Sequence, residues 1–279
     1  MSTRTLAITG ATGFVGATLL AQALAEGYQV RALTRRPQPP RAGVVWVLGA
    51  LNQPESLAEL VHGADAVIHV AGVVNAPDKS GFVEGNITGT QAMVAAAEAA
   101  GIARFVHVSS LAARAPDLSV YGWSKAQAEL AVAASALDWV MVRPPWVYGP
   151  GDLDTLDLSR LLLALTVPGV ARGQILEADD GVSNGWTNKS IAAAIAAAMG
   201  RRALVLSTPR TVLRLGAWAD HLVRGAKAKL TKDRVRYFCH PDWRIDAQHR
   251  PDAKIWTPQI ETRTGLKDTA ESYRTAGLL

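Results

Sequence analysis

Cysteine is almost absent from this chain, because Cys239 is the only one among 279 residues. A single cysteine excludes an internal disulfide and indicates a reducing compartment. Its neighbours Tyr237, Phe238 and Pro241 are typical of packing, so we do not expect a catalytic thiol. No His, Cys and Asp residues recur at the spacing of a metal site, and we expect no metal.

Long hydrophobic runs are also missing. The longest, 161–167 and 191–199, fall well short of the ~18 residues that a membrane span needs. A first strand expected from Thr5 leaves no room for a signal or transit peptide, so we expect a cytoplasmic protein. The partners would be a small-molecule substrate and no nucleic acid, since no aromatic and basic recognition motif is present. We expect a monomer or a homodimer.

Charge is present but unevenly spread. The net charge is +5, yet residues 210–236 alone contain eight Lys or Arg against two Asp. Residues 211–226 can form a helix with an apolar side and a basic side. We favour a lid or domain-closing helix over the substrate pocket. The alternative is a helix that lies on an anionic membrane or accepts an acidic partner.

Apolar runs and helical patterns alternate through the first half of the chain. Strands are expected at 5–9, 29–34, 44–48, 66–71, 105–109 and 139–143, with helices at 14–26, 54–62, 86–100 and 122–136. Nearly continuous apolar strands are buried on both faces, as in parallel sheets. The pattern predicts an α/β fold, a Rossmann-type doubly wound parallel sheet.

The rhythm changes after Gly151, where five of the eight tryptophans lie if Trp146 is counted with them. We expect a nucleotide-binding domain over 1–150 and a smaller C-terminal substrate-binding region over 151–279. A helix at 190–199 and a strand at 203–207 are expected to return to the main sheet, so that 188–207 would belong to the first domain.

Three glycines recur at the first strand-to-helix turn, within the stretch ITGATGFVG from Ile8 to Gly16. At such a turn Gly10 permits the tight bend, Gly13 lets the backbone approach a pyrophosphate, and Gly16 allows helix and strand to pack closely. The helix N-terminus supplies free N–H groups and a partial positive charge. The turn therefore predicts a dinucleotide site.

Polar residues that suit proton transfer lie near the same sheet edge. Ser109 and Ser110 end the fifth strand, and Tyr121 and Lys125 open the next helix four residues apart, on one face. A tyrosine pKa near ~10 is poorly matched to neutral pH, but a nearby ammonium lowers it. We expect Lys125 and a positively charged oxidised nicotinamide to lower the Tyr121 pKa.

Several motifs in order make a family resemblance specific. They are TGATGFVG, HVAG from His69, GNITGT from Gly85, HVSS from His107, YGWSK from Tyr121 and RPPWVYGPGD from Arg143. Together they resemble the short-chain dehydrogenase/reductase superfamily, in its extended or atypical epimerase-like branch. The resemblance covers residues 5–152.

The resemblance implies a Ser–Tyr–Lys site. Tyr121 would pass a proton to or from the substrate oxygen, Lys125 would lower its pKa and hold the nicotinamide ribose, and Ser110 would orient the carbonyl. Asn86 would have a supporting role. The implied cofactor-binding residues are Gly10, Thr12, Gly13, Phe14, Val15, Gly16, Arg35, Arg36, Ala71, Gly72, Tyr121, Lys125, Pro144 and Val147.

The nucleotide is expected to be NADP(H), with NAD(H) as the alternative. The second strand ends in Thr34-Arg35-Arg36, where NAD-specific folds place an acidic residue for the ribose 2′-OH. Arginine makes charge-assisted bonds to a phosphate, so both guanidiniums suit a 2′-phosphate. Ala50 departs from the family, because relatives often have an Asp there that contacts adenine.

Three functions remain open at this point. We favour an NADP(H)-dependent oxidoreductase that acts on the carbonyl or alcohol of a small to medium, fairly apolar substrate. A sugar-nucleotide epimerase with tightly held NAD is the first alternative. Leu111-Ala112-Ala113 after Ser110 lacks the acidic pair of a dehydratase, which disfavours dehydration. The third is a non-catalytic nucleotide-binding structural or redox-sensing subunit, which usually lacks the Tyr or Lys.

Overall fold

The computed structural model describes residues 4–145, 153–206, 208–225 and 228–279. Seven parallel strands form one sheet in the order β3-β2-β1-β4-β5-β6-β7. The strands are β1 (Thr5–Thr9), β2 (Gln29–Thr34), β3 (Val44–Leu48), β4 (Ala66–His69), β5 (Phe105–Val108), β6 (Trp139–Arg143) and β7 (Gln174–Glu177). The expected doubly wound α/β fold is confirmed.

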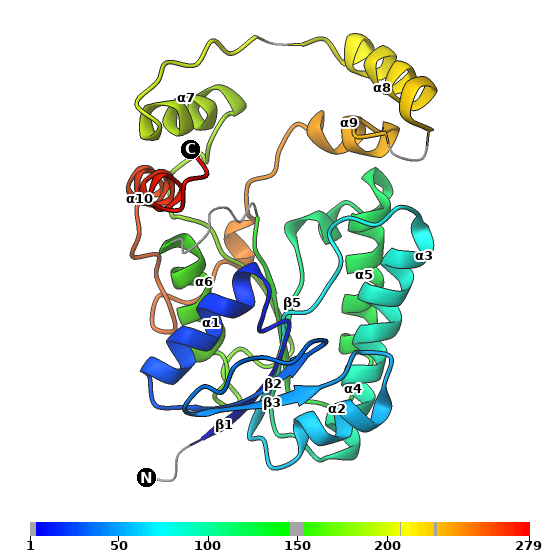
Figure 1. Ribbon diagram of the computed structural model, residues 1–279, viewed down its shortest axis with the longest axis vertical. Coiled ribbons are helices and arrows are strands. Elements are labelled where there is room, and N and C mark those ends of the chain that lie inside the picture. The colour runs from blue at the N-terminus through cyan, green and yellow to red at the C-terminus, as the bar shows by residue number, and fades with distance from the viewer. Residues whose placement is uncertain (1–3, 146–152, 207, 226–227) are drawn as a thin grey trace.

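Helices cover both faces of the sheet, which gives three layers (Figure 1). On one face, α1 (Phe14–Ala25) and α6 (Leu153–Ala164) pack over a core that includes Leu6 and Ile8. On the other, α2 (Pro54–Val61), α4 (Gly89–Ala99) and α5 (Val120–Ala133) pack over a core that includes Ala7. Successive strand residues point to opposite faces, so both cores need apolar runs in each central strand.

The seventh strand differs from the expected one. No strand forms over the described residues 201–206, where Leu204 and Leu206 are exposed. Instead β7 pairs with β6, and it was missed because only Ile175 and Leu176 stand between polar residues in this short edge strand. Helix α7 (Asn188–Ala198) packs against α10 (Thr262–Thr275) and not against the sheet. The prediction that 190–207 returns to the sheet was therefore wrong.

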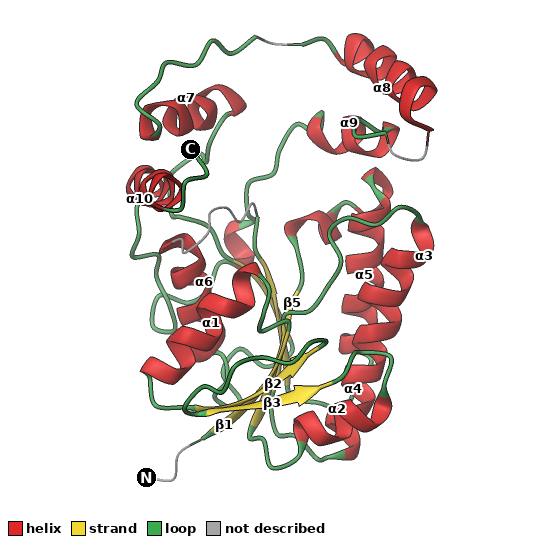
Figure 2. Cartoon of the chain, in the orientation of Figure 1, coloured by secondary structure: helices red, strands yellow, loops and turns green. Residues whose placement is uncertain are grey.

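The chain after β7 consists of helices and loops in its described part (Figure 2). It contains α8 (Arg210–Arg224), α9 (Lys232–Phe238) and a short 3-10 helix, η5 (Ala247–His249). The shorter elements before β6 are α3 (Lys79–Phe82), a π-helix η1 (Val83–Thr88), and two 3-10 helices, η2 (Leu111–Arg114) and η3 (Pro116–Leu118). Within the described ranges, no helix combines the length and hydrophobicity of a membrane span.

Candidate active site

Gly10 and Gly16 form a turn that leaves no room for a side chain. Gly10 has a φ of +75°, and a Cβ there would lie 2.8 Å from the backbone nitrogen of Ala71. A Cβ on Gly16 would lie 2.0 Å from the Gly10 carbonyl oxygen. Gly10 is required both by its positive φ and by the closeness of Ala71, whereas Gly16 is required only by the closeness of the Gly10 backbone.

Gly13 has a different environment, which fits a phosphate. A Cβ there would approach only the Gly10 carbonyl oxygen, at 3.2 Å. Gly13 is the N-cap of α1, and no side chain caps this helix or places an acid in its first turn. The first N–H groups of a helix have no partner within it, so those of Phe14, Val15 and Gly16 can bind an anion. The residues present therefore fit a dinucleotide pyrophosphate.

The other expected nucleotide residues lie along the same sheet edge. Thr12 and Phe14 are exposed at the turn, and Arg35 and Arg36 are exposed just after β2. The Thr34 hydroxyl donates to the Arg36 carbonyl oxygen at 2.7 Å, which fixes the chain direction there. No ion pair found in the described part of the chain involves either arginine.

Ala71 and Gly72 follow β4 and join the nucleotide turn to the Tyr–Lys helix. A Cβ on Gly72 would lie 3.7 Å from Lys125 Nζ, so the two residues are neighbours. Pro144, after β6, is buried, and its carbonyl oxygen accepts from the Leu111 backbone N–H at 3.0 Å. Val147 lies outside the described residues.

Ser110 and Tyr121 meet because the start of α5 packs tightly on η2. Ser119 caps α5 by accepting from the Gly122 backbone N–H at 3.0 Å. A Cβ on Gly122 would lie 2.7 Å from the Ala112 carbonyl oxygen, so only glycine permits this approach. The Ser110 hydroxyl lies close enough to the Tyr121 phenol to act on its pKa. The close packing of α5 on η2 therefore explains why the YGWSK motif has a glycine at position 122.

The Tyr121 pKa moves in the direction opposite to the expectation. Burial raises it above its ordinary value, and the nearby Ser110 hydroxyl only partly offsets this effect. The buried Lys125 ammonium instead donates to the Val108 carbonyl oxygen at 2.8 Å. Burial lowers the Lys125 pKa to about 8, although the charge of Glu129 acts in the other direction. In the protein without a bound nicotinamide, the Tyr121 pKa is therefore raised and not lowered.

Asn86 joins the π-helix η1 to helix α5. Its amide donates to the Val73 carbonyl oxygen and to Ser124 Oγ, both at 2.9 Å, and accepts from the Val73 backbone N–H at 2.6 Å. A Cβ on Gly85 would lie 2.3 Å from Val73 Cγ2, so the π-helix can approach only through a glycine. π-Helical turns are frequent at functional sites. The contacts of Asn86 are with the backbone of Val73 and with Ser124, so in this structure it holds these segments together.

A buried network of ion pairs, which the sequence did not reveal, lies next to Ser110. Ser109 donates to Glu129 at 2.5 Å, and the Arg143 guanidinium binds Glu129 through two hydrogen bonds of 2.8 and 2.6 Å. Arg143 also contacts the fully buried Glu177, which Arg114 approaches to 3.2 Å. Ser109 thus has a structural partner, while Ser110 faces Tyr121. The network joins α5, β6, β7 and η2.

His69 and His107 are fully buried and stack on each other, with ring centroids 5.4 Å apart. His69 bonds to Thr9 and Thr90 at 2.7 and 3.1 Å. Burial, and then the charge of Lys125, lower the His69 pKa to about 3 and the His107 pKa well below its usual range. Both rings are neutral at physiological pH, in agreement with the expected packing role.

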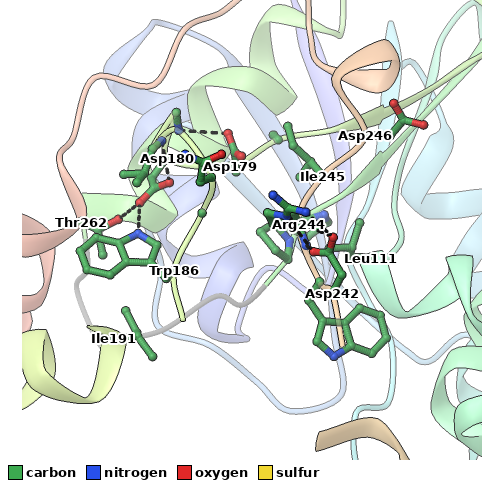
Figure 3. Close-up of a pocket in the computed structure, with 18 of the residues that line it drawn as sticks. Leu111, Asp179, Asp180, Trp186, Ile191, Asp242, Arg244, Ile245, Asp246 and Thr262 are labelled. Carbon is green, nitrogen blue, oxygen red and sulfur yellow. Dashed lines mark hydrogen bonds and ion pairs between the residues drawn. The ribbon is translucent and has the colours of Figure 1, made fainter. Parts of the chain in front are cut away.

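A large cavity of about 1500 Å³ opens beside the Ser–Tyr–Lys group. Leu111, Arg114, Pro144 and Pro145 line it on the side of η2 and β6, and the rest of its wall comes from residues after 156. Figure 3 shows two sides, one with Asp179, Asp180 and Trp186 and the other with Asp242 and Arg244. The Trp186 indole N–H donates to Asp180 at 2.6 Å, which fixes the ring at the wall.

Each arginine of the cavity wall is already paired with a carboxylate. Arg114, Arg244 and Arg250 line the cavity, and each is paired with a carboxylate, of Glu177, Asp242 and Asp179 respectively. Five aspartates line the cavity: Asp157, Asp179, Asp180, Asp242 and Asp246. Acidic groups therefore outnumber arginines on the wall.

Tyr237 lies between this cavity and Tyr121. It lines the cavity from α9, and its pKa is raised by burial and by the nearby Tyr121 phenol. The rings of Tyr237 and Trp243 lie 4.5 Å apart. Sequence reasoning had treated Tyr237 only as packing around Cys239, and no motif marked it.

Comparisons with known proteins agree with this geometry. The NAD(P)H-binding family model matches residues 10–156. The "Ceramide reductase" of Caulobacter vibrioides is 34% identical over 98% of this chain and 96% of its own. Two solved structures match at lower identity. They are gox2253 (TM-score 0.76, 19% identity, all of both chains) and MoeE5 with UDP-glucuronic acid and NAD (TM-score 0.70, 20% identity, 98% and 99% of the chains). Taken with the glycine turn and the sheet order, these matches show that the chain belongs to the short-chain dehydrogenase/reductase superfamily, in its extended epimerase-like branch, as an NAD(P)-dependent enzyme.

Proposed function

We propose that the chain is an NADP(H)-dependent oxidoreductase that interconverts the carbonyl and alcohol of a fairly apolar, lipid-like substrate. The observation that carries this proposal is the meeting of Ser110, Tyr121 and Lys125 beside Gly72, at the edge that also holds the glycine turn. The bound nicotinamide would supply or accept hydride, and the side chains would handle the proton and the substrate oxygen.

In the reductive direction Tyr121 donates its phenolic proton to the substrate oxygen, while Ser110 hydrogen-bonds the same oxygen and orients it. A raised pKa keeps the phenol protonated, which suits this role. Lys125 lies beside Gly72, where its ammonium can stabilise the phenolate left after proton transfer. With a pKa of about 8, Lys125 is mostly charged at neutral pH.

NADP(H) is favoured by the two exposed guanidiniums after β2. Neither Arg35 nor Arg36 is used in an ion pair of the described chain, so both can meet a 2′-phosphate without breaking other contacts. Replacing both arginines by serine should weaken NADPH binding more than tenfold and leave NADH binding almost unchanged. The matched control is Arg172→Ser, another exposed arginine. Equal losses for both nucleotides would contradict the proposed selectivity.

The region after residue 150 is proposed to bind the substrate, chiefly through the segments 178–188 and 237–250. Its cavity contains tryptophans, Ile191 and Ile245 beside an excess of aspartates. An excess of carboxylates repels a nucleotide diphosphate, which disfavours the sugar-nucleotide epimerase. The relative that matches along the whole chain, substrate region included, is named for ceramide, which also favours an apolar substrate.

The proposal is tested by NADPH oxidation with long-chain ketones, with UDP-glucose as the competing substrate class. We expect turnover of ketones only, and a loss in kcat of about a thousandfold in Tyr121→Phe, within the range for general acid catalysis. NADPH binding by this variant should be retained. Tyr237→Phe is the matched control, since it removes a neighbouring phenol from the cavity wall and should change KM more than kcat. Full turnover in Tyr121→Phe would remove the catalytic assignment.

A further inference from the structure

Helix α8 presents an apolar face that nothing in the described structure covers. Along one side of it, Leu215, Trp218 and Leu222 are 66%, 60% and 64% exposed, and Val212 and Val223 are also exposed. The spacing of three and four residues places the first three side chains on one helix face. Among the residues of α8, only Ala217 is buried. Scattered single apolar residues are ordinary on a surface, but a contiguous apolar face marks an interaction site.

The charge around this face is of one sign. Asp220 is the only acidic residue of α8, and it turns away to accept from the Lys229 and Leu230 backbone N–H groups at 2.6 and 2.7 Å. Arg214 lines the same surface hollow as Leu215 and Trp218, and neither Arg210 nor Arg214 is in an ion pair of the described chain. The apolar face therefore has free cations at its side and no carboxylate.

The structure does not support the lid that the sequence favoured. No residue of α8 lines the large cavity, whose α9 wall is formed by Tyr237 and Phe238. Helix α8 packs on α9, and Gly216 approaches Leu230 on that side. The apolar face points elsewhere, because the contact side of the helix is the one with Gly216, Ala217 and Asp220.

We propose that α8 binds the surface of an anionic lipid bilayer. A Trp and Leu face beside unpaired arginines is the pattern of an interfacial amphipathic helix, which buries its apolar face at the headgroup boundary. An acidic protein partner or a second copy fits less well. A second copy would bring its own positive charge against this one, and the density of arginines near an uninterrupted apolar face suits a laterally uniform anionic surface.

The location of α8 allows such docking. Figure 1 places α8 at the opposite end of the long axis from the N-terminus and the sheet, with the connection from α7 running along the same end. That connection contributes the exposed Leu204 and Leu206. Phe238 of α9 is 61% exposed and also lines the cavity, so docking of α8 would bring one cavity wall near the lipid. Lipid binding itself does not rest on the proposed oxidoreductase function.

Vesicle co-sedimentation tests the proposal with the full chain at low salt. We expect the protein to pellet with vesicles of equal parts phosphatidylglycerol and phosphatidylcholine, and to stay in solution with phosphatidylcholine alone. Replacing Leu215 and Leu222 together by Ser should reduce the partition coefficient at least about tenfold. Replacing Arg210 and Arg214 by Gln should reduce it about fivefold for each arginine.

Control substitutions at other exposed sites, together with measurements of folding, show whether a loss of vesicle binding is specific to α8. Leu130→Ser changes a leucine of α5 that is 62% exposed, and Arg172→Gln with Lys267→Gln removes two exposed charges elsewhere. These controls should sediment as the wild type does, and every variant should retain NADPH binding and its melting temperature. Absence of pelleting at low salt would overturn the proposal, as would unchanged binding by the Leu215 and Leu222 variant. Conversion of a dimer to a monomer by that variant, with vesicle binding unchanged, would assign the face to self-association instead.

Discussion

Helices α1 and α5 on the cofactor side and helices α7, α8 and α9 beyond β7 differ in how they are held. Helix α5 buries six of its residues, Lys125 and Glu129 among them, and α1 buries four. Helices α7, α8 and α9 bury one residue each, namely Ala194, Ala217 and Val235. Packing fixes the geometry of the first group to the precision that proton and hydride transfer need. The second group has few buried contacts, so its side chains remain available to substrate or lipid.

Ion pairs should show the largest contrast between the two regions. Arg143→Met would leave Glu129 buried without its ion-pair partner, and would remove one of the two arginines that bind the buried Glu177. Breaking a buried pair in this way typically costs about 4 kcal/mol of unfolding free energy. The hydrogen bonds and charges of the two glutamates raise the Arg143 pKa against the effect of burial, which shows the strength of the coupling. Urea denaturation at neutral pH measures the loss.

The matched control is Arg224→Met, which breaks the exposed pair with Asp220 on α8. Surface pairs of this spacing contribute about 0.3 to 0.5 kcal/mol, so stability should hardly change. Similar losses in both variants would mean that the network around Arg143 is no more important to the fold than a surface pair, and the comparison between the regions would fail.

The same exchange of Gly for Ala should have opposite signs in the two regions. Gly16→Ala places a methyl group 2.0 Å from the Gly10 carbonyl oxygen, so the backbone must move. We expect a loss of roughly 3 kcal/mol, in the range for a strained core change, together with weaker nucleotide binding. Gly216→Ala meets only Leu230 at 3.5 Å, an ordinary contact. There alanine should stabilise helix α8 by about 0.5 to 1 kcal/mol.

Thermal unfolding of both variants, with and without NADPH, measures these effects. Gly13→Ala is the intermediate case, because its Cβ would meet only the Gly10 carbonyl oxygen at 3.2 Å. It should fold well and lose mainly nucleotide affinity. A stable Gly16→Ala protein with normal nucleotide binding would show that the turn tolerates a side chain where the structure leaves no room.

Much of the cofactor side could be predicted from the sequence, because its elements repeat local signals. Apolar runs set β1, β2, β3 and β6 to the residue, and the glycine spacing marked the α1 turn. The C-terminal region gave weaker signals. Strand β7 has only two apolar residues, and its place depends on pairing with β6. The run near Leu204 has β propensity, but its described residues 201–206 pair with no strand.

Long-range contacts explain the other misses. No sequence motif marked Glu129, which Arg143 and Ser109 contact in the interior. Tyr237 lies at the cavity near Tyr121 because α9 packs on η3, a contact between segments far apart in the sequence. The Tyr121 pKa was expected to fall through Lys125 on the same helix face together with a bound oxidised nicotinamide, and the structure describes the protein without that nicotinamide. Burial, which depends on the whole fold, acts more strongly and raises it.

Lys125 should reduce stability in the region that packing otherwise holds firmly. Burial lowers its pKa from 10.5 to about 8, which corresponds to about 3 kcal/mol of disfavoured charge. Because the folded state binds this proton less tightly than the unfolded state, the penalty is full below pH 8 and disappears as pH rises toward 10.5.

Lys125→Met removes this penalty but also leaves the Val108 carbonyl oxygen without its donor, at a cost of about 1 kcal/mol. The variant should therefore be more stable than the wild type by about 2 kcal/mol at pH 7, with activity lost. Denaturation at pH 7 and at pH 9.5, with exposed Lys189→Met as the control, measures the difference. A gain that does not shrink between these two pH values would show that the Lys125 charge is not its cause.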